Sequence, residues 1–113
     1  MPDHVTRART DQDRLFTGRL GALESVRLMR SCVLVAGLGN IGALLAILLA
    51  RLGVGLIRLV DRDRLEAKNL RNQSYGQPAD VDRWKTDVMA GQIQQLNRGI
   101  TIDTITADLA DVP

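Results

Sequence analysis

Residues 37–42 read GLGNIG, and this G-x-G-x-x-G spacing is typical of loops that bind nucleotide phosphates. In such a loop the first glycine, Gly37, permits a tight turn, and the second, Gly39, lets the backbone approach a phosphate closely. The third, Gly42, lets the following helix pack tightly against the preceding strand. The N-terminus of that helix, which includes Asn40, then offers free N–H groups to the phosphates.

Asp61 follows the last glycine of this loop by 61 − 42 = 19 residues. An acidic side chain about 20 residues further on accepts hydrogen bonds from ribose hydroxyls in dinucleotide sites. The alternative is that the glycines serve packing alone and that Asp61 caps a turn. The agreement between glycine spacing, acid spacing and context favours a nucleotide site. NAD and ATP both remain open, whereas the carboxylate would repel the 2′-phosphate of NADP.

The residues around the loop predict a strand, a helix and a second strand. Residues 32–36 (CVLVA) are a short apolar run of the kind that forms a strand buried on both faces. Residues 41–52 are rich in Ala and Leu, which predicts a helix packed deep against a sheet, with Gly53 just past its end. Residues 55–60 predict the second strand, which ends at Asp61. Because such crossovers are right-handed, the two strands are expected to be parallel.

The remaining segments extend this pattern. Those with regular hydrophobic spacing are a short amphipathic helix at 22–29, an amphipathic surface helix at 81–98 that Asp80 or Asp82 could cap, and a strand at 100–106. Residues 62–80 are polar and predict a loop with one helical turn near 64–71. The sequence therefore predicts an α/β, Rossmann-like fold with a partial doubly wound parallel sheet of about three strands and flanking helices.

The composition is that of an ordinary globular domain and excludes several classes of protein. A chain of 113 residues, 45% hydrophobic and 25% charged, is expected to form one domain. The net charge is only +2 and 3% of residues are aromatic, which argues against a nucleic-acid-binding surface. Cys32 is the only cysteine, so a multi-cysteine zinc site is excluded, no metal ligands are assigned, and an inert core thiol is expected.

Hydropathy gives no indication of a membrane protein. The longest apolar run, residues 41–50, is half the length of about 20 residues that a membrane-spanning helix needs. Residues 1–13 are polar and lack periodicity, so we expect a flexible N-terminal arm without a secretory signal. These features predict a cytoplasmic protein without membrane contact, folded over residues 14–113.

The sequence beyond the second strand resembles a known superfamily. Residues 61–85 read DRDRLEAKNLRNQSYGQPADVDRWK, and residues 14–23 read RLFTGRLGAL. These segments are similar to the ThiF/MoeB/HesA superfamily, the adenylating enzymes related to ubiquitin-activating enzyme. Their pattern is a glycine loop, a strand ending in D-x-D, then N-L-N-R-Q, then a lysine that opens a helix. The resemblance runs from about Arg14 to Thr106.

The resemblance implies an ATP site and a reaction. Its implied residues are Asp61 at the ribose, Asp63 as the second acid, Asn69, Gln73 and Lys85 around the triphosphate, and Arg14, which in dimeric members reaches the partner's ATP. The implied activity is ATP-dependent activation of a carboxylate as an acyl-adenylate, with Mg²⁺ accompanying the ATP. The implied acceptors are the C-terminus of a ubiquitin-like sulfur-carrier protein or, in the tRNA threonylcarbamoyladenosine dehydratase branch, a tRNA carboxylate.

Three positions depart from the family pattern. Asn40 stands in place of a fourth glycine, Asn72 in place of the arginine of N-L-N-R-Q, and Asp82 in place of a glycine before the lysine. Arg71 is one position away from Asn72, and a one-residue shift on a helix rotates a side chain by about 100°. Arg71 therefore need not supply the missing charge, and the change weakens the expected catalysis more than nucleotide binding.

The family's later aspartate and cysteines have no assignable position in this sequence. Residues 14–113 are therefore expected to be the N-terminal half of a Rossmann-like nucleotide-binding domain, inactive alone, with the first strand at an exposed sheet edge. Because such an edge favours association, we expect a homodimer or pairing through that edge. Two alternatives stay open: an NAD-binding module of an oxidoreductase or regulatory protein, which GLGNIG also suits, and a non-catalytic interaction module, which the loss of the arginine at position 72 favours.

Overall fold

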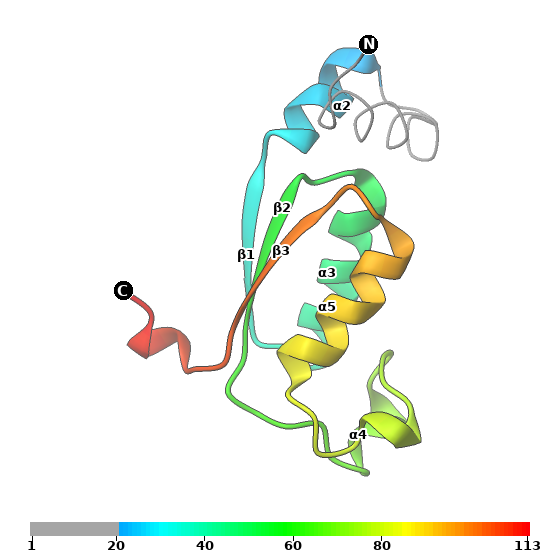
Figure 1. Cartoon of the computed structure of the whole chain (residues 1–113), viewed down its shortest axis with the longest axis vertical. Helices are drawn as coiled ribbons and strands as arrows, with labels where there is room; N and C mark the ends of the chain where they lie inside the picture. The colour runs from blue at the N-terminus through cyan, green and yellow to red at the C-terminus, as the bar shows by residue number, and fades with distance from the viewer. Residues whose placement is uncertain (1–20) are drawn as a thin grey trace.

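The computed structural model describes residues 21–113, which form one parallel sheet with helices packed on one face (Figure 1). The expected arm at 1–13 and Arg14 lie outside the described residues. The strands are β1 (Cys32–Ala36), β2 (Leu56–Val60) and β3 (Thr101–Ile105). The helices are α2 (Ala22–Met29), α3 (Asn40–Leu52), α4 (Asn69–Asn72) and α5 (Lys85–Leu96), with 3-10 turns at Pro78–Asp80 and Leu109–Asp111.

The three strands lie in the order β1-β2-β3 and all pairs are parallel. The register places Leu34, Arg58 and Asp103 side by side across the sheet. Helix α3 connects β1 to β2 and α5 leads into β3, and Figure 1 shows both helices on the same side. The predicted α/β, Rossmann-like architecture of three parallel strands is confirmed, and β1 lies at an edge.

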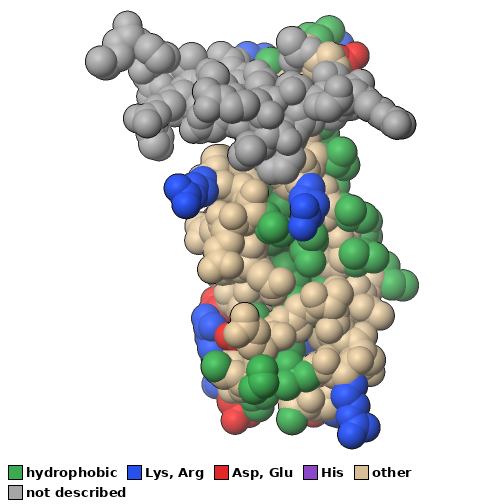
Figure 2. Space-filling model, turned by 90° about the vertical axis from the view of Figure 1, so that its right-hand side faces the viewer, with side chains coloured by type: hydrophobic (Ala, Val, Ile, Leu, Met, Phe, Trp, Pro, Cys, Tyr) green, Lys and Arg blue, Asp and Glu red, His purple; other side chains and the backbone are tan. Residues whose placement is uncertain are grey.

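Helix α3 approaches the sheet through alanines, which agrees with the prediction of a helix packed deep against a sheet. Ala43, Ala46 and Ala50 are completely buried against the sheet. Ile47 and Leu49 are partly buried and pack against the core. The other large side chains of the helix are about half or more exposed, and they are Ile41, Leu44, Leu45, Leu48 and Leu52. Figure 2 shows hydrophobic side chains along one side of this face of the molecule. Small residues allow the helix backbone to come close to the strands, and most of the larger residues of this helix point outward.

Helix α3 also bears on the question of a membrane segment. It is the longest helix within residues 21–113 and has 13 residues. No helix in that range has both the length and the apolar character needed to cross a membrane.

Within residues 21–113 no element covers the sheet face opposite α3 and α5, which corrects the prediction that β1 is buried on both faces. Leu34 and Cys32 are exposed there, so Cys32 is a surface thiol rather than a core thiol. The ion pair between Arg58 and Asp103 lies on the same face, with 3.1 Å between Nη2 and Oδ2. The run CVLVA is apolar on both sides, but the described helices cover only one of them.

Helix α5 begins later than the hydrophobic pattern indicates. Its first residue is Lys85 and its N-cap is Trp84, without a side-chain cap, so neither Asp80 nor Asp82 caps it. The residues before it form a short antiparallel contact with the residues after β2: Leu65 N–H donates to Arg83 O (2.8 Å), and Arg64 is bridged to Trp84. Residues 62–84, here called the connecting segment, therefore form a long loop whose two ends are joined. The contact between residues 64–65 and 83–84 is called its base.

Candidate nucleotide-binding site

The glycine loop, residues 37–42, joins the carboxyl end of β1 to the N-terminus of α3. Gly37 has a φ of 90°, a left-handed conformation that favours glycine, and its N–H donates to Val60 O (2.8 Å). A Cβ on Gly42 would overlap the carbonyl oxygen of Gly37, whereas a Cβ on Gly39 would have no neighbour within 4 Å. Gly42 therefore serves close packing, and the surface at Gly39 is open to a ligand.

The N-terminus of α3 is electrostatically suited to an anion. Its first turn contains no acidic residue, and its N-cap is Gly39, which has no side chain to fill the cap. Within residues 21–113, no acceptor pairs with the backbone N–H groups of residues 39–42. Unpaired N–H groups and the positive end of the helix dipole attract phosphate groups.

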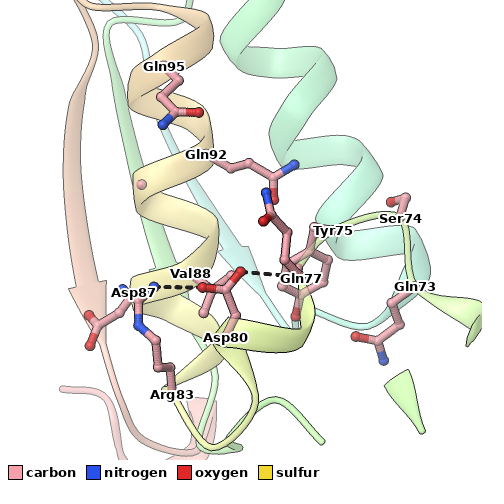
Figure 3. Close-up of a pocket in the computed structure, with 12 residues that line it drawn as sticks. Gln73, Ser74, Tyr75, Gln77, Asp80, Arg83, Asp87, Val88, Gln92 and Gln95 are labelled. Carbon is pink, nitrogen blue, oxygen red and sulfur yellow. Dashed lines mark hydrogen bonds and ion pairs between the residues drawn. The ribbon is translucent and has the colours of Figure 1, made fainter. Parts of the chain in front are cut away.

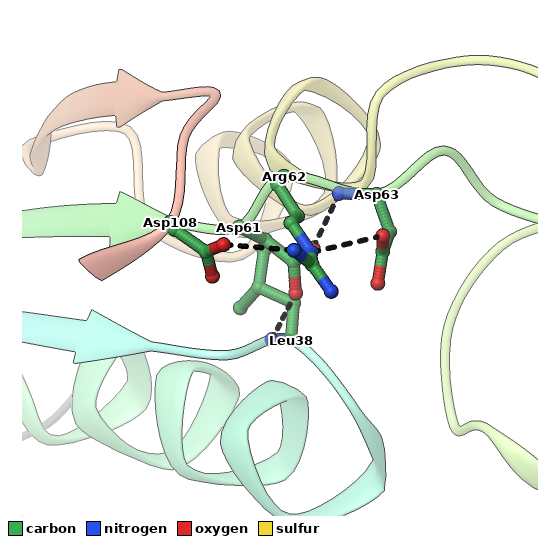
Figure 4. Close-up of polar contacts among 5 residues, drawn as sticks. All are labelled: Leu38, Asp61, Arg62, Asp63 and Asp108. Carbon is green, nitrogen blue, oxygen red and sulfur yellow. Dashed lines mark hydrogen bonds and ion pairs between the residues drawn. The ribbon is translucent and has the colours of Figure 1, made fainter. Parts of the chain in front are cut away.

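Asp61 connects the second strand to the glycine loop (Figure 4). Its Oδ2 accepts a hydrogen bond from Leu38 N–H (2.7 Å), and its Oδ1 accepts one from Asp63 N–H (2.7 Å). The two bonds hold the carboxylate at the carboxyl ends of β1 and β2. Each carboxylate oxygen has a further lone pair, so the group can still accept hydrogen bonds from ribose hydroxyls.

A hollow of about 330 Å³ lies beside this carboxylate at the carboxyl ends of the three strands. Its lining residues are Ala36, Gly37, Val60, Asp61, Arg62, Asp63, Ala107, Asp108 and Leu109. Arg62 forms an exposed ion pair with Asp108 (2.8 Å) at its wall, and Figure 4 shows Arg62 between Asp63 and Asp108. In open α/β sheets, ligands bind in the crevice outside the carboxyl ends of the strands.

Tyr75 is a site residue that the sequence analysis missed. It comes from the connecting segment, is 3% exposed, and its hydroxyl donates to Leu38 O at 2.6 Å. Burial raises the pKa of the Tyr75 hydroxyl well above its usual range, and the negative charges of Asp61 and Asp63 raise this pKa further. The phenol therefore keeps its proton and remains a hydrogen-bond donor at any physiological pH. Nothing in the sequence pattern signals a contact between residues 37 positions apart.

Asn69 and Gln73, which the resemblance implies at the triphosphate, do not line the hollow beside Asp61. Asn69 is buried, and its Oδ1 accepts a hydrogen bond from Glu66 N–H (2.8 Å), so it stabilises its own turn. Gln73 lines a second hollow of about 630 Å³ between the connecting segment and α5 (Figure 3). Its Oε1 is buried and has no hydrogen-bond partner among the described residues.

The second hollow is polar. Figure 3 shows Gln77 and Gln92 reaching toward one another from the connecting segment and from α5. The carboxylate of Asp80 accepts from Gln77 N–H (2.9 Å) and from Arg83 (2.8 Å). Tyr75 links this second hollow to the glycine loop, because it lines the hollow and its hydroxyl donates to Leu38 O.

Lys85 lies where the resemblance expects a phosphate-binding lysine, at the start of α5. Its backbone N–H donates to Asp63 O (3.1 Å), which places this helix terminus beside the D-x-D residues. The residue is only 7% exposed, and within residues 21–113 its amine has no ion pair or hydrogen bond. An anionic ligand at this helix terminus would give the amine a partner of opposite charge.

The three departures from the family pattern have distinct structural settings. Asp82, at the position where the family has glycine, has a φ of 73°, a left-handed conformation that favours glycine. Asn40 is exposed on the first turn of α3, and Asn72 and Arg71 are exposed on α4. Only the change at Asp82 therefore carries a backbone cost.

The arrangement combines a helix N-terminus with unpaired N–H groups, a carboxylate with free lone pairs and, at the start of α5, the amine of Lys85. No group of three or more His, Cys, Asp or Glu side chains within residues 21–113 is placed to hold a metal ion. Asp61 and Asp63 fit a metal only as single oxygen donors beside a bound phosphate, because Asp61 is already bonded to two N–H groups.

Comparison with known proteins gives related sequences and folds. The tRNA threonylcarbamoyladenosine dehydratase of Bacillus subtilis is 39% identical over 86 residues, which cover 76% of this chain and 33% of that protein. The sulfur carrier protein ThiS adenylyltransferase of Escherichia coli is 37% identical over 79 residues, 70% of this chain and 32% of that protein. The structure of E. coli MccB with AMPCPP and MccA superposes with a TM-score of 0.76 at 31% identity, over 80% of this chain and 29% of that one.

The chain spans about a third of the length of each of these relatives. The sequence pattern of the ThiF family matches residues 12–112, which is nearly the whole chain. The resemblance noted from residues 61–85 is thus confirmed, and the chain belongs to the ThiF family.

Proposed function

We propose that this chain is the ATP-binding portion of an adenylating enzyme, with the hollow beside Asp61 as the nucleoside site. The observation that carries the proposal is the Asp61 carboxylate bonded to Leu38 N–H, directly before a helix N-terminus with unpaired N–H groups. This arrangement places a ribose acceptor and a phosphate-binding terminus next to each other. The adenylyltransferase relative supports ATP over NAD, as does the structure of MccB with AMPCPP.

The proposed reaction needs positioning and positive charge rather than a protein nucleophile. A substrate carboxylate oxygen attacks the α-phosphorus of ATP, the bond from that phosphorus to the bridging oxygen breaks, and pyrophosphate leaves with the electron pair. The N–H groups of the glycine loop and the amine of Lys85 would stabilise the charge on the phosphates. Asn69 and Gln73 would contribute only after their side chains turn from their present positions. Mg²⁺ would neutralise phosphate charge.

The substrate carboxylate is proposed to belong to a macromolecule. The relatives that match this chain include an adenylyltransferase of a sulfur carrier protein and a tRNA-modifying dehydratase. A ubiquitin-like carrier protein is therefore one candidate acceptor and a tRNA carboxylate the other. Because the chain spans about a third of these relatives, residues 14–113 are proposed to be the N-terminal half of the nucleotide domain, inactive alone. A second copy, paired through the β1 edge, would supply Arg14.

Nucleotide titration tests the proposal. Calorimetry would compare Mg²⁺-ATP, AMPCPP and NAD on the unaltered chain and on Asp61→Asn. An asparagine at this position would turn its NH₂ group toward one of two backbone N–H donors. The variant therefore loses one of the hydrogen bonds to Leu38 and Asp63 and also one of the oxygens that could accept from ribose. Asp103→Asn is the matched control, since Asp103 forms an exposed ion pair on the uncovered face of the sheet.

The expected result is binding of ATP and AMPCPP that Asp61→Asn weakens at least tenfold and Asp103→Asn leaves unchanged. Tight binding of NAD that ATP does not displace would overturn the proposal and favour the oxidoreductase-type alternative. Binding of neither nucleotide would favour an interaction module without chemistry.

A further inference from the structure

We propose that Tyr75 is a positioning residue whose hydroxyl fixes the peptide of Leu38, so that the glycine loop presents its N–H groups to phosphate in advance of the ligand. The inference rests on the proposed function, because it assigns to Tyr75 the preorganisation of that same site. Preorganised donors bind and stabilise charge better than donors that must first be ordered.

The two polar groups of Leu38 are both held from outside the loop. Its N–H donates to Asp61 Oδ2 (2.7 Å) at the end of β2, and its carbonyl accepts from the Tyr75 hydroxyl (2.6 Å). The Leu38 side chain is completely buried. The residue that leads into α3 is therefore fixed at three points, two of them polar and 23 and 37 residues away in the sequence.

Fixing the Leu38 carbonyl also sets the direction of the next N–H group. Within residues 21–113 no peptide bond is cis, so the carbonyl of Leu38 and the N–H of Gly39 point in opposite directions across one planar unit. When Tyr75 holds the carbonyl, the Gly39 N–H is directed away from the Tyr75 ring. This N–H has no acceptor within residues 21–113, and the surface beside the Gly39 Cα is open, since a Cβ there would have no neighbour within 4 Å.

A purely structural role for Tyr75 would require only its ring. The ring already packs in the hydrophobic core, while the hydroxyl is used on the loop that the proposed function assigns to phosphate. The bond from the Tyr75 hydroxyl to Leu38 O is also the only hydrogen bond between residues 62–84 and residues 37–42. Asp61 and Asp63 disfavour ionisation of the phenol, so it remains a donor.

Tyr75→Phe tests the inference, because it deletes one hydroxyl and keeps the ring. The matched control is Asn97→Ala, since Asn97 is 2% exposed and its Nδ2 donates to Ala50 O (2.9 Å) near the opposite end of α3. Three quantities would be measured on each protein: backbone ¹⁵N order parameters of residues 38–42 without ligand, the dissociation constants of ATP and tripolyphosphate, and the melting temperature.

We expect Tyr75→Phe to lower the order parameters at residues 38–42 and to weaken ATP and tripolyphosphate about five- to tenfold. Asn97→Ala is expected to lower the melting temperature at least as much while both dissociation constants stay unchanged. Unchanged order parameters, or unchanged dissociation constants, in Tyr75→Phe would overturn the inference. If ATP fails to bind the unaltered chain, the proposed function fails, and tripolyphosphate with the order parameters still decides the role of Tyr75.

A second variant keeps the test informative if Tyr75→Phe does not fold. Tyr75 is the only tyrosine, so growth on 3,5-difluorotyrosine labels this position alone. The fluorinated phenol donates a hydrogen bond at low pH and ionises at a lower pH than tyrosine. Order at residues 38–42 and tripolyphosphate affinity should then fall together as the phenol ionises, observed by ¹⁹F resonance. Loop order that is indifferent to this ionisation would overturn the inference.

Discussion

The glycine loop and the connecting segment are the two halves of the candidate site, and they are built in different ways. Residues 37–42 are placed by the strands and helix on either side of them, and the N–H groups of Gly37 and Leu38 donate to Val60 and Asp61 at the end of β2. Residues 62–84 are closed at their base and reach the glycine loop through one hydroxyl, that of Tyr75. The first half belongs to the fold itself, and the second half is docked onto it.

This difference explains why the polar groups of the glycine loop are already available to a ligand, whereas those of the connecting segment are not. In the glycine loop the carboxylate of Asp61 and the N–H groups of α3 already face one region. In the connecting segment Asn69 bonds to its own turn, and the Oε1 of Gln73 is buried without a partner among the described residues. Substitutions in the connecting segment should therefore change binding with little effect on the sheet. In the glycine loop, the effect depends on whether the residue packs against the fold, as Gly42 does, or borders the open surface, as Gly39 does.

The largest expected effect comes from a pair of glycines within the loop. Gly42→Ala places a Cβ against the carbonyl oxygen of Gly37, which is backbone and cannot move aside, and should cost about 3 kcal/mol of unfolding free energy. Gly39→Ala meets nothing within 4 Å and should cost less than about 1 kcal/mol as a change of N-cap residue. Urea unfolding would measure both.

Gly39→Ala should nevertheless weaken ATP binding strongly, because its methyl group occupies the open surface that a phosphate would approach. A stable Gly39→Ala protein with unaltered ATP affinity would show that this surface does not contact phosphate. An undisturbed melting temperature in Gly42→Ala would contradict the close packing of α3 on the loop.

The docking of the connecting segment should be sensitive to alkaline pH. The pKa of Tyr75 is raised in the folded protein, while an unfolded tyrosine ionises near pH 10. Below about pH 10 the stabilising contribution is fully present. As pH rises from there toward the raised folded pKa, only the unfolded chain loses the proton, and stability falls by up to about 1.4 kcal/mol per pH unit.

Urea unfolding between pH 9 and 11 would measure this effect, with Tyr75→Phe as the reference. The difference in stability between the two proteins should shrink with rising pH, because Tyr75→Phe has no phenol to ionise. Parallel pH profiles would mean that the Tyr75 hydroxyl is not buried against Leu38.

A substitution at Asp82 is expected to raise the stability of the protein rather than lower it. Its φ of 73° is unfavourable for any residue with a Cβ, so Asp82→Gly should stabilise the protein by about 1 kcal/mol. Asp82→Ala, which keeps the strain and loses the aspartate's tolerance of it, should destabilise the protein. Thermal unfolding of both variants checks the prediction, and a destabilising Asp82→Gly would mean that the carboxylate has a stabilising contact outside the described residues.

The sequence predicted well those parts in which neighbouring residues determine the structure. The predicted helix at 22–29 is confirmed, the strands differ by about one residue at their ends, and Asp61 lies beside the glycine loop as its spacing predicted. The start of α5 was wrong by four residues because Val81 and Trp84 fit the helical spacing but lie in the base of the connecting segment.

Tertiary contacts account for what the pattern could not predict. The exposure of β1 depends on which sheet face has a helix, and the burial of alanines rather than leucines in α3 depends on how closely that helix approaches. Tyr75 lies in a polar stretch, and its partner is a carbonyl, which any residue offers. The roles of Asn69, Gln73 and Lys85 came from the family resemblance alone, and they remain predictions.

The smallest expected effect concerns the base of the connecting segment. Arg64 lies 3.9 Å above the ring centre of Trp84, and its Nη1 donates to Asp82 O (2.7 Å). Arg64→Met keeps the length of the side chain and removes the charge, at a cost of about 0.5 to 1 kcal/mol. Trp84 is the only tryptophan, so its fluorescence reports the loss of this contact alone.

The order parameters of residues 37–42 should stay unchanged in Arg64→Met, because Tyr75 and not the base attaches the segment to the loop. Arg71→Met, at an exposed position on α4, controls for the loss of one surface cation. If Arg64→Met loosens the glycine loop as much as Tyr75→Phe does, the base and the hydroxyl act as one unit. The site would then have a single cooperative construction instead of two halves.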